Sequence, residues 1–513
     1  MPLEHGACAG EKVLIIGAGI GGLATALSLK NEDVDVVIVE RDPEPIELER
    51  ADEAFDRWQR PGVPQFRHAH ILLARLQTLV RDRHPALHAE LMQAGFELSS
   101  LKEMLPPDQV KQYTVLPGDE DLSHFWGRRA TFEYVLRQHV GRLPRVRFVH
   151  SARVEGLVLD VKDEAVHVRG VTLTRAGVTE TLLADVVVDA SGKRTQCPAQ
   201  LENAGARIRF ERIPSNWQYV CRHYLLDDVN APLTRQGTGA NLDFFGYSTF
   251  YGERGHFAIT LGCPDDERDI ARAMRRPDGF DAICQQIPVL DEWMRHSTVR
   301  SKVLGAARFG NGWTHYRDGG KEILGYFAVG DSQMETNPVY GRGCTSAFVQ
   351  GDTLSTVLAT TKDPAERSRR YYMTTRELLL PHFNFSIRTD HMLQSRSKQS
   401  RGLPIPAADR FVRHAFETVW IPAMNSSPLV AREMLKAMEM RELSPLGVRL
   451  AVAFQLLWHF VLSFFRKPPP ALFVGPPRAE LMAKLPVPKQ ERDEPAVRVG
   501  GDDEQWDADA AAL

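Results

Sequence analysis

KVLIIGAGIGG, which runs from Lys12 to Gly22, is the stretch of this sequence that decides the fold. After Lys12, the next four residues are aliphatic and rich in β-branched side chains, so Lys12–Ile16 is predicted to be a buried parallel strand. The glycines come next as G-x-G-x-x-G and open a predicted helix over Leu23–Lys30, and Val34–Val39 reads as a second buried strand. Strand, glycine turn, helix and strand together form one βαβ unit.

The three spaced glycines of this turn suit a dinucleotide for separate physical reasons. Gly17 permits the tight turn, Gly19 lets backbone N–H groups approach a pyrophosphate, and Gly22 lets the helix pack closely on the sheet. The helix N-terminus adds unpaired donors and a partial positive charge. Glu40 ends the second strand, where its carboxylate can accept bonds from ribose hydroxyls, and Arg41 beside it is a further cofactor-binding candidate.

Composition sets the class of protein around this unit. The chain has 513 residues, of which 43% are hydrophobic and 25% charged, as in a soluble chain with a large core. Lys and Arg (63) nearly balance Asp and Glu (66), which argues against nucleic acid as the main partner. The six cysteines are far apart and none forms a C-x-x-C pair, so we expect no metal site and a reducing compartment. We read no signal peptide and expect a cytoplasmic protein.

Further elements are predicted by hydrophobic periodicity along the chain. Alternation predicts strands at Val146–Val154 and Val166–Thr174, and apolar runs predict buried strands at Ala184–Asp189 and Tyr326–Val329. Helices are expected at Ile71–Arg81, Arg128–Val140 and through most of the C-terminal third. The predicted fold class is therefore α/β with α+β insertions: a Rossmann-like FAD-binding domain, a β-sheet substrate domain and a helical C-terminal region. The expected boundaries are 10–200 and 319–360 for the two parts of the FAD-binding domain, 201–318 for the substrate domain, 361–488 for the helical region and 489–513 for a disordered acidic tail.

Two later strand ends indicate which dinucleotide, FAD or NAD, the glycine turn binds. Asp189-Ala190-Ser191-Gly192 ends one buried strand, where the chain can pass near a cofactor, and Gly330-Asp331 ends another, where a carboxylate can hold a ribityl hydroxyl. With the glycine turn, these reproduce a three-part signature, and the sequence resembles the para-hydroxybenzoate hydroxylase-like superfamily of FAD-dependent monooxygenases. The resemblance implies FAD as the cofactor.

Two loops narrow the resemblance. Arg60-Pro61-Gly62-Val63-Pro64-Gln65-Phe66-Arg67-His68-Ala69-His70 is similar to the GVPQ-x-x-H-x-H loop of the flavin-dependent epoxidases of polyether antibiotic biosynthesis, and Asn337–Gly343 is similar to their NPVYG-x-G loop. The similarity runs from about Lys12 to about Leu358. Gln65 and His68 are the polar groups expected beside the isoalloxazine ring, whereas His70 is as readily a structural histidine.

The second loop also has a physical interpretation. Its residues Pro338, Gly341 and Gly343 lead into a helix whose N-terminus, aimed at the flavin pyrimidine, would stabilise the negative charge of the reduced ring. A plain capping turn is the alternative. Arg129 can hold the ribose or pyrophosphate with its fork of donors, or be an ordinary helix-surface arginine.

The resemblance implies a monooxygenase, in which reduced FAD and O2 form a C4a-hydroperoxide that gives one oxygen to an alkene or an aromatic ring of an apolar, specialised-metabolite substrate. Such chemistry needs no nucleophile or metal in the protein. NADPH or NADH would reduce the flavin transiently, or a separate reductase would. An FAD-dependent reductase or dehydrogenase acting on a prenyl or other long apolar chain is the alternative. Flavin-dependent halogenases are disfavoured because their W-x-W-x-I-P signature is not found.

The aromatic, strand-like segment from Trp217 to Leu261 predicts a sheet that lines the substrate pocket, although the core of a half-buried sheet needs the same residues. The candidate lining residues are Tyr219, Phe245, Tyr247, Phe257 and Tyr340.

Leu450–Phe465 is the most apolar segment, and a single polar stripe recurs along it at every fourth residue: Gln455, His459 and Ser463. At 1.5 Å per residue, 16 residues reach about 24 Å, short of the ~30 Å hydrocarbon core. We therefore expect either a buried docking helix or an interfacial helix that makes a peripheral membrane contact through 448–466, flanked by Arg449, Arg466 and Lys467.

Overall fold

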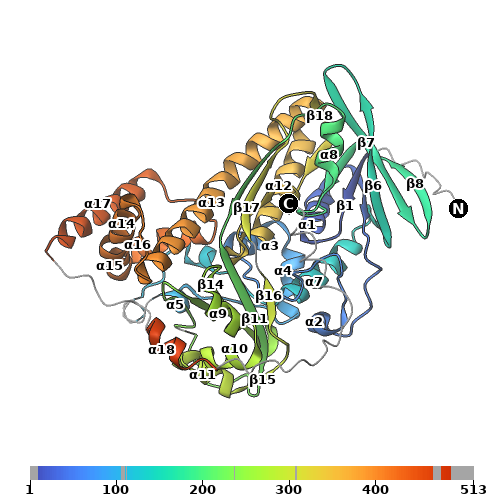
Figure 1. Ribbon diagram of the computed structural model, residues 1–513. Coiled ribbons are helices and arrows are strands. Elements are labelled where there is room, and N and C mark those ends of the chain that lie inside the picture. Colours follow the sequence, from blue (N-terminus) through green and yellow to red (C-terminus); the bar gives the residue numbers. More distant parts are fainter. Residues whose placement is uncertain are drawn as a thin grey trace.

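A five-stranded parallel sheet organises the N-terminal part of the chain (Figure 1). The computed structural model describes residues 10–105, 110, 113–235, 237–306, 309–465 and 475–486. The strands are ordered β19-β9-β1-β2-β5, so the strand latest in sequence pairs with strands from the first 190 residues. Their bounds are β1 (Glu11–Ile16), β2 (Val34–Val39), β5 (Val146–Val149), β9 (Val186–Asp189) and β19 (Tyr326–Ala328). This arrangement confirms the predicted α/β class with a Rossmann-like sheet.

Helices of the same region pack on this sheet and on one another. Gly351 brings two of them together, because a Cβ there would lie 3.0 Å from the Thr25 Cα. The close approach joins α1, which begins after the glycine turn, to α12, which begins after the Asn337–Gly343 loop. The helices are α1 (Ile20–Ser28), α2 (Ala54–Arg57), α3 (Ala74–Arg83), α4 (Pro85–Gln93), α7 (Arg129–Gly141), α8 (Cys197–Asn203) and α12 (Arg342–Thr360).

A second, antiparallel sheet has the order β12-β13-β14-β11-β15, with β16 also paired to β11. Short helices cover one of its faces (Figure 1). The strands are β11 (Trp217–Leu226), β12 (Gly239–Asn241), β13 (Gly246–Tyr251), β14 (His256–Pro264), β15 (Ser297–Val299) and β16 (Leu304–Ala306). The covering helices are α9 (Arg268–Met274), α10 (Pro277–Cys284), α11 (Pro288–Arg295) and α18 (Arg478–Ala483).

The strand predicted at Val146–Val154 is in fact two strands. Ser151 has a φ of 53°, a left-handed conformation that ends the parallel strand β5 and redirects the chain. The next strand, β6 (Ala152–Val161), pairs antiparallel with β7 (Ala165–Arg175) in a projecting sheet that also contains β8 (Val178–Leu183) and β18 (Glu322–Leu324). A further, antiparallel sheet consists of β10 (Arg209–Pro214), β17 (Gly310–His315) and β20 (Met334–Glu335).

The C-terminal region is helical, as expected. The long helix α13 (Pro364–Ser400) packs along α12 and leads to a cluster of helices at one side of the molecule (Figure 1). The cluster contains α14 (Ala407–Ala415), the π-helical turn η7 (Phe416–Trp420), α15 (Ile421–Ser426), α16 (Pro428–Met438) and α17 (Leu446–Ser463). The predicted tail 489–513 lies outside the described residues.

The expectation of a buried docking helix at Leu450–Phe465 is wrong. In α17 only Val452 is buried, and most of its large apolar side chains are exposed. Among the described residues, α17 is the one helix whose length and composition would suffice to cross a membrane.

Candidate functional site

The glycine turn lies at the carboxyl edge of the parallel sheet, between β1 and α1. Gly17 has a φ of 96°, and a Cβ there would lie 2.7 Å from the Ala190 carbonyl oxygen. At Gly22 a Cβ would lie only 1.9 Å from the Gly17 carbonyl oxygen. At Gly19, the first residue before the helix, a Cβ would meet nothing within 4 Å. Two of the glycines are thus required by the fold itself, and the third borders open space.

A buried charge network holds this turn in place. Glu40 Oε2 accepts a hydrogen bond from the Ala18 N–H at 2.8 Å, and Oε1 accepts one from the Asp42 N–H at 3.0 Å. Arg60 bridges Glu40 (3.2 Å), Asp42 (2.8 Å) and Glu133 (3.0 Å), and it donates to the Ala18 carbonyl. Burial acts to raise the pKa of Glu40, but Arg60 and the two amide donors lower it overall. The candidate ribose ligand is therefore fixed as an anion before any nucleotide binds.

The two arginines predicted to contact the cofactor, Arg41 and Arg129, have protein partners. Arg129 donates to Glu133 at 2.8 Å and lies 3.3 Å from His70 Nε2, and Arg41 donates to the Gly62 carbonyl at 3.1 Å. Arg129 is buried, so the interpretation as an ordinary surface arginine is wrong. Its contact with a cofactor stays a prediction.

Asp331 lies three residues after the end of β19, at the same edge of the sheet. Burial raises the pKa of its carboxyl to about 6, and the nearby Glu335 carboxylate adds to the effect. Within the described residues its carboxylate accepts no hydrogen bond. Gly330, with a φ of 68°, borders open space, as does Gly343 at the start of α12.

These features fit FAD. Gly19, Gly330 and Gly343 are three glycines that each border open space, and they come from the starts of α1 and α12 and the end of β19. Asp331 supplies a half-buried carboxylate, and no group among the described residues donates a hydrogen bond to it. Backbone surfaces free of side chains let a long, flat cofactor approach, and the carboxylate suits a hydroxyl donor.

Asp189, by contrast, serves the sheet. Its carboxylate accepts hydrogen bonds from Ser191 Oγ (2.6 Å), Thr195 Oγ1 (2.5 Å) and Tyr326 Oη (2.9 Å), and the residue is fully buried. The Asp189–Gly192 segment therefore binds β9 to β19 through this side chain. Because the Asp189 side chain is used within the sheet, only the backbone of this segment is left to contact a cofactor, as the sequence predicts.

The Asn337–Gly343 loop is fixed from a distant helix. Asp390 of α13 accepts hydrogen bonds from Asn311 Nδ2 (2.7 Å), Asn337 Nδ2 (2.7 Å) and Tyr340 Oη (2.6 Å). Burial raises the pKa of Asp390, although these donors oppose the rise. Gly341, with a φ of 65°, sits where a Cβ would lie 2.0 Å from the Ile71 side chain.

Pro338 begins the short 3-10 turn of this loop and is exposed, while Tyr340 is half-buried against Asp390. Tyr340, predicted to line the pocket, thus anchors the loop.

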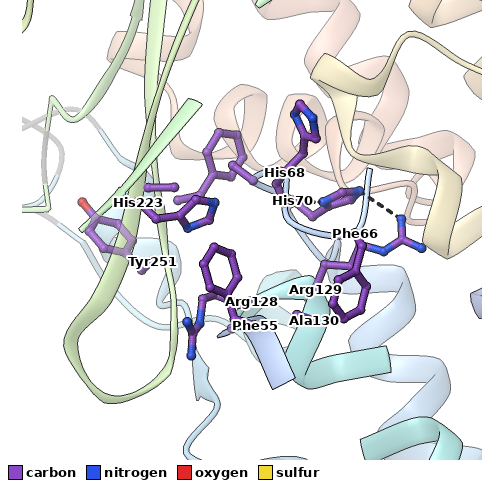
Figure 2. A pocket seen from close by; sticks show the side chains of 13 residues that line it. Phe55, Phe66, His68, His70, Arg128, Arg129, Ala130, His223 and Tyr251 are labelled. Carbon is purple, nitrogen blue, oxygen red and sulfur yellow. Dashed lines mark hydrogen bonds between the residues drawn. The ribbon is translucent and has the colours of Figure 1, made fainter. Parts of the chain in front are cut away.

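A pocket lies between the Arg60–His70 loop, the start of α7 and the second sheet (Figure 2). Its lining combines aromatic rings with donors: Phe55, Phe66, His68, Ala69, His70, Gly127, Arg128, Arg129, Ala130, His223, Phe250, Tyr251 and Ala258. The rings of Phe55 and His223 lie 4.6 Å apart, and Arg128 is held by Glu253 at 2.8 Å. The pocket is thus mainly apolar, with fixed polar groups.

The pocket histidines are neutral at physiological pH. Burial, helped by the charge of Arg129, lowers the pKa of His68 to about 4 and that of His70 to about 3. His70 donates from Nδ1 to the His68 carbonyl (2.8 Å), which leaves Nε2 to accept from Arg129. His70 is therefore a satisfied structural histidine. His68 contacts the Tyr219 ring, and Gln65 is exposed at the loop's surface.

Three of the aromatic residues predicted to line the pocket lie on the wrong face of the second sheet. Phe245, Tyr247 and Phe257 belong to the core between this sheet and helices α9–α11. The register shows why, because Tyr224 and Phe257 are directly opposite each other on the helix-covered face. The other face carries Tyr219↔Gly262, Cys221↔Thr260 and His223↔Ala258, and it meets the Arg60–His70 loop.

Sequence reasoning missed several residues that build this site. Arg60 begins the loop that runs to His70, but the sequence does not show that it bridges three buried carboxylates. Glu133 stands four residues after Arg129, a spacing that indicates an ion pair along a helix. His223 Nδ1 and Thr260 Oγ1 are buried without a hydrogen-bond partner among the described residues, on the face toward the loop. No sequence pattern around Asp390 indicates that it holds the Asn337–Gly343 loop.

Comparison with known proteins supports the fold. Residues 15–46 match the family model of the NAD(P)-binding Rossmann-like domain. The chain is 25% identical to Protein Rv3254 of Mycobacterium tuberculosis (strain ATCC 25618 / H37Rv), over 68% of this chain and 73% of that protein. It is 26% identical to a 3-(3-hydroxy-phenyl)propionate/3-hydroxycinnamic acid hydroxylase of Burkholderia cenocepacia (strain HI2424), over 68% of this chain but only 56% of the hydroxylase.

Solved structures share the overall fold. The flavin-dependent brominase Bmp2 superimposes with a TM-score of 0.57 at 14% identity, over 89% of this chain and 100% of that one. PqsL of Pseudomonas aeruginosa, described as a probable FAD-dependent monooxygenase, gives 0.55 at 16% identity, over 76% and 98%. The chain therefore shares its overall fold with these flavin-dependent enzymes.

Proposed function

We propose that this chain is an FAD-dependent monooxygenase that adds one oxygen atom from O2 to an apolar substrate. The observation that carries the proposal is the position of an open glycine cradle beside Asp331 at the carboxyl edge of the sheet. The monooxygenase fold and the hydroxylase relative support the same reaction type.

The chain's own residues have separate tasks in this proposal. The open glycines at Gly19 and Gly343 let backbone N–H groups of α1 and α12 approach the bound cofactor. Asp331 accepts a hydrogen bond from a ribityl hydroxyl, and Glu40 and Arg60 hold the nucleotide turn rigid. When bound, FAD supplies the activation of O2, which the protein residues need not provide.

The pocket excludes water from the reacting atoms. Phe55, Phe66 and Phe250 form apolar walls, and neutral His68 and His70 add polarity without charge. With FAD bound, backbone donors at the start of α12 would stabilise the negative charge of the reduced ring.

Two groups are candidates for the oxidised position. The Arg60–His70 and Asn337–Gly343 loops favour an alkene, because they resemble those of the polyether epoxidases. The hydroxylase relative favours an aromatic ring. NADPH or NADH is the proposed electron donor, with a separate reductase as the other source.

Extraction of the purified protein gives the first test, in which we expect FAD and not FMN. The reduced protein then reacts in a single turnover under ¹⁸O2 with two substrates, a 3-hydroxyphenyl propionate and an apolar alkene. A product that is heavier by about two mass units through one added ¹⁸O supports the proposal. A product that is oxidised or reduced without label would make the chain a dehydrogenase or reductase.

A further inference from the structure

The outward face of α17 is an apolar surface that no other described part of the chain covers. Nine of the 27 exposed large hydrophobic side chains in the described residues lie between Leu446 and Phe465. Phe454 is 70% exposed and Trp458 is 56% exposed. Leu450, Phe454, Leu457, Trp458, Val461, Phe464 and Phe465 succeed one another at helical spacing, so they form one continuous face. We call these seven residues the α17 face.

The polarity of this helix is inverted relative to that of a helix on the surface of a soluble protein. Its polar stripe points toward the protein: His459 Nε2 lies 2.9 Å from Ser426 Oγ of α15, and Gln455 Oε1 is buried. Val452, on the same side, packs with Ala423 and Val430. A surface helix normally places its charged and polar residues outward, so the α17 face is built to contact something other than water.

The charge around the helix selects the partner. Of the nine Lys and Arg in residues 401–467, five form ion pairs with carboxylates: Arg401, Arg413, Arg432, Lys436 and Arg441. The positive charge that distinguishes the two ends of α17 therefore comes from Arg449, Arg466 and Lys467. Arg449 is exposed at the start of the helix, and the sequence places Arg466 and Lys467 directly after it. A symmetric contact between two copies would bring two positively charged regions together, whereas an anionic surface would attract them.

We propose that the α17 face lies in the headgroup region of an anionic lipid bilayer and anchors the protein peripherally. The polar stripe bound to α15 keeps one side of the helix on the protein, so the helix lies along the bilayer instead of crossing it. Trp458 and the phenylalanines supply the large apolar side chains that such interfacial helices bury. The other helices of the C-terminal cluster (407–438) carry α17 at one side of the molecule (Figure 1).

Flotation of the full-length protein with lipid vesicles tests this proposal. Vesicles of phosphatidylcholine alone are compared with vesicles that also contain phosphatidylglycerol, at low and high salt. We expect the wild type to float with the anionic vesicles and the Phe454→Ser/Trp458→Ser variant to bind at least about tenfold more weakly, because both side chains leave water on binding. The exposed residues Leu183 (66%) and Phe210 (60%) lie on strands far from α17 in sequence, so the Leu183→Ser/Phe210→Ser variant is a matched control.

Thermal unfolding establishes that both double variants are folded. Weaker binding of the α17 variant alone, together with a requirement for anionic lipid, supports the proposal. Equal binding by both variants, or no flotation of the wild type with either vesicle, overturns it. Absence of flotation combined with a dimer that the α17 variant dissociates would show instead that the face joins two copies of the chain.

Discussion

The two glycine-containing loops of the candidate site are held in different ways. The main supports of the Gly17–Gly22 turn are local, namely its own backbone and Glu40 at the end of the next strand, and Ala190 and Arg60 add contacts from further along the chain. The Asn337–Gly343 loop is instead fixed by Asp390, about 50 residues later on α13. The main supports of a local motif can thus be recognised in the sequence beside it. The residue that holds the Asn337–Gly343 loop lies on another helix, and the loop's own sequence does not indicate it.

The largest effect is expected in the locally held turn, from Gly22→Ala. Its Cβ would lie 1.9 Å from the Gly17 carbonyl, so the turn has to shift. We expect FAD affinity to fall by more than about 100-fold and the free energy of unfolding to fall by several kcal/mol. FAD titration and thermal unfolding of the cofactor-free protein measure the two quantities.

Gly19→Ala separates the two effects, because its Cβ meets no atom of the protein within 4 Å. We expect nearly unchanged thermal stability without FAD, but weaker FAD binding, since the methyl group occupies space needed by the cofactor. Unchanged FAD affinity in Gly19→Ala would show that the cofactor does not approach this turn.

In the distantly held loop, Asp390→Ala removes the acceptor shared by Asn311, Asn337 and Tyr340. Unpaired buried donors are costly, so we expect the free energy of unfolding to fall by about 3 kcal/mol. Glu366→Ala on the same helix is the control, because the carboxylate of this residue pairs with a nearby arginine at the solvent-exposed surface, so its loss should change stability far less. Urea unfolding measures both.

FAD binding by Asp390→Ala sharpens the comparison further. The glycine turn is intact in this variant, so its FAD affinity should fall much less than that of Gly22→Ala. Equal losses in the two variants would mean that the loops are not supported independently.

The sequence predicted the elements whose causes are local. β2 has the predicted bounds, Val34–Val39, because a short apolar run between turn residues has few other solutions. The βαβ unit and the return of β19 to the same sheet are also encoded in such patterns. Ser151 escaped prediction because a single left-handed residue inside an alternating pattern leaves no mark on hydrophobicity.

The remaining errors concern which face of an element meets which partner. The aromatic residues at Phe245, Tyr247 and Phe257 have the composition of a pocket wall, but alternation gives two faces without saying which one helices cover. In α17 the polar stripe was recognised, yet its direction toward α15 depends on tertiary packing. Arg60 and Asp390 illustrate the same limit, since their roles depend on partners distant in sequence.

The smallest expected effect comes from Asp331, and it depends on pH. Burial raises the pKa of this carboxyl to about 6 in the cofactor-free protein. A ribityl hydroxyl donates to the ionised form, so FAD binding lowers the pKa, and wild-type affinity should fall as the pH drops through 6. Asp331→Asn cannot ionise, although its amide oxygen still accepts a hydrogen bond, so we expect it to bind FAD about 10-fold more weakly at pH 8, the lower end of the range for one charge-assisted hydrogen bond. Titrations at several pH values should therefore give a flat curve for the variant that the wild-type curve approaches near pH 5. Parallel curves would show that Asp331 does not contact the cofactor.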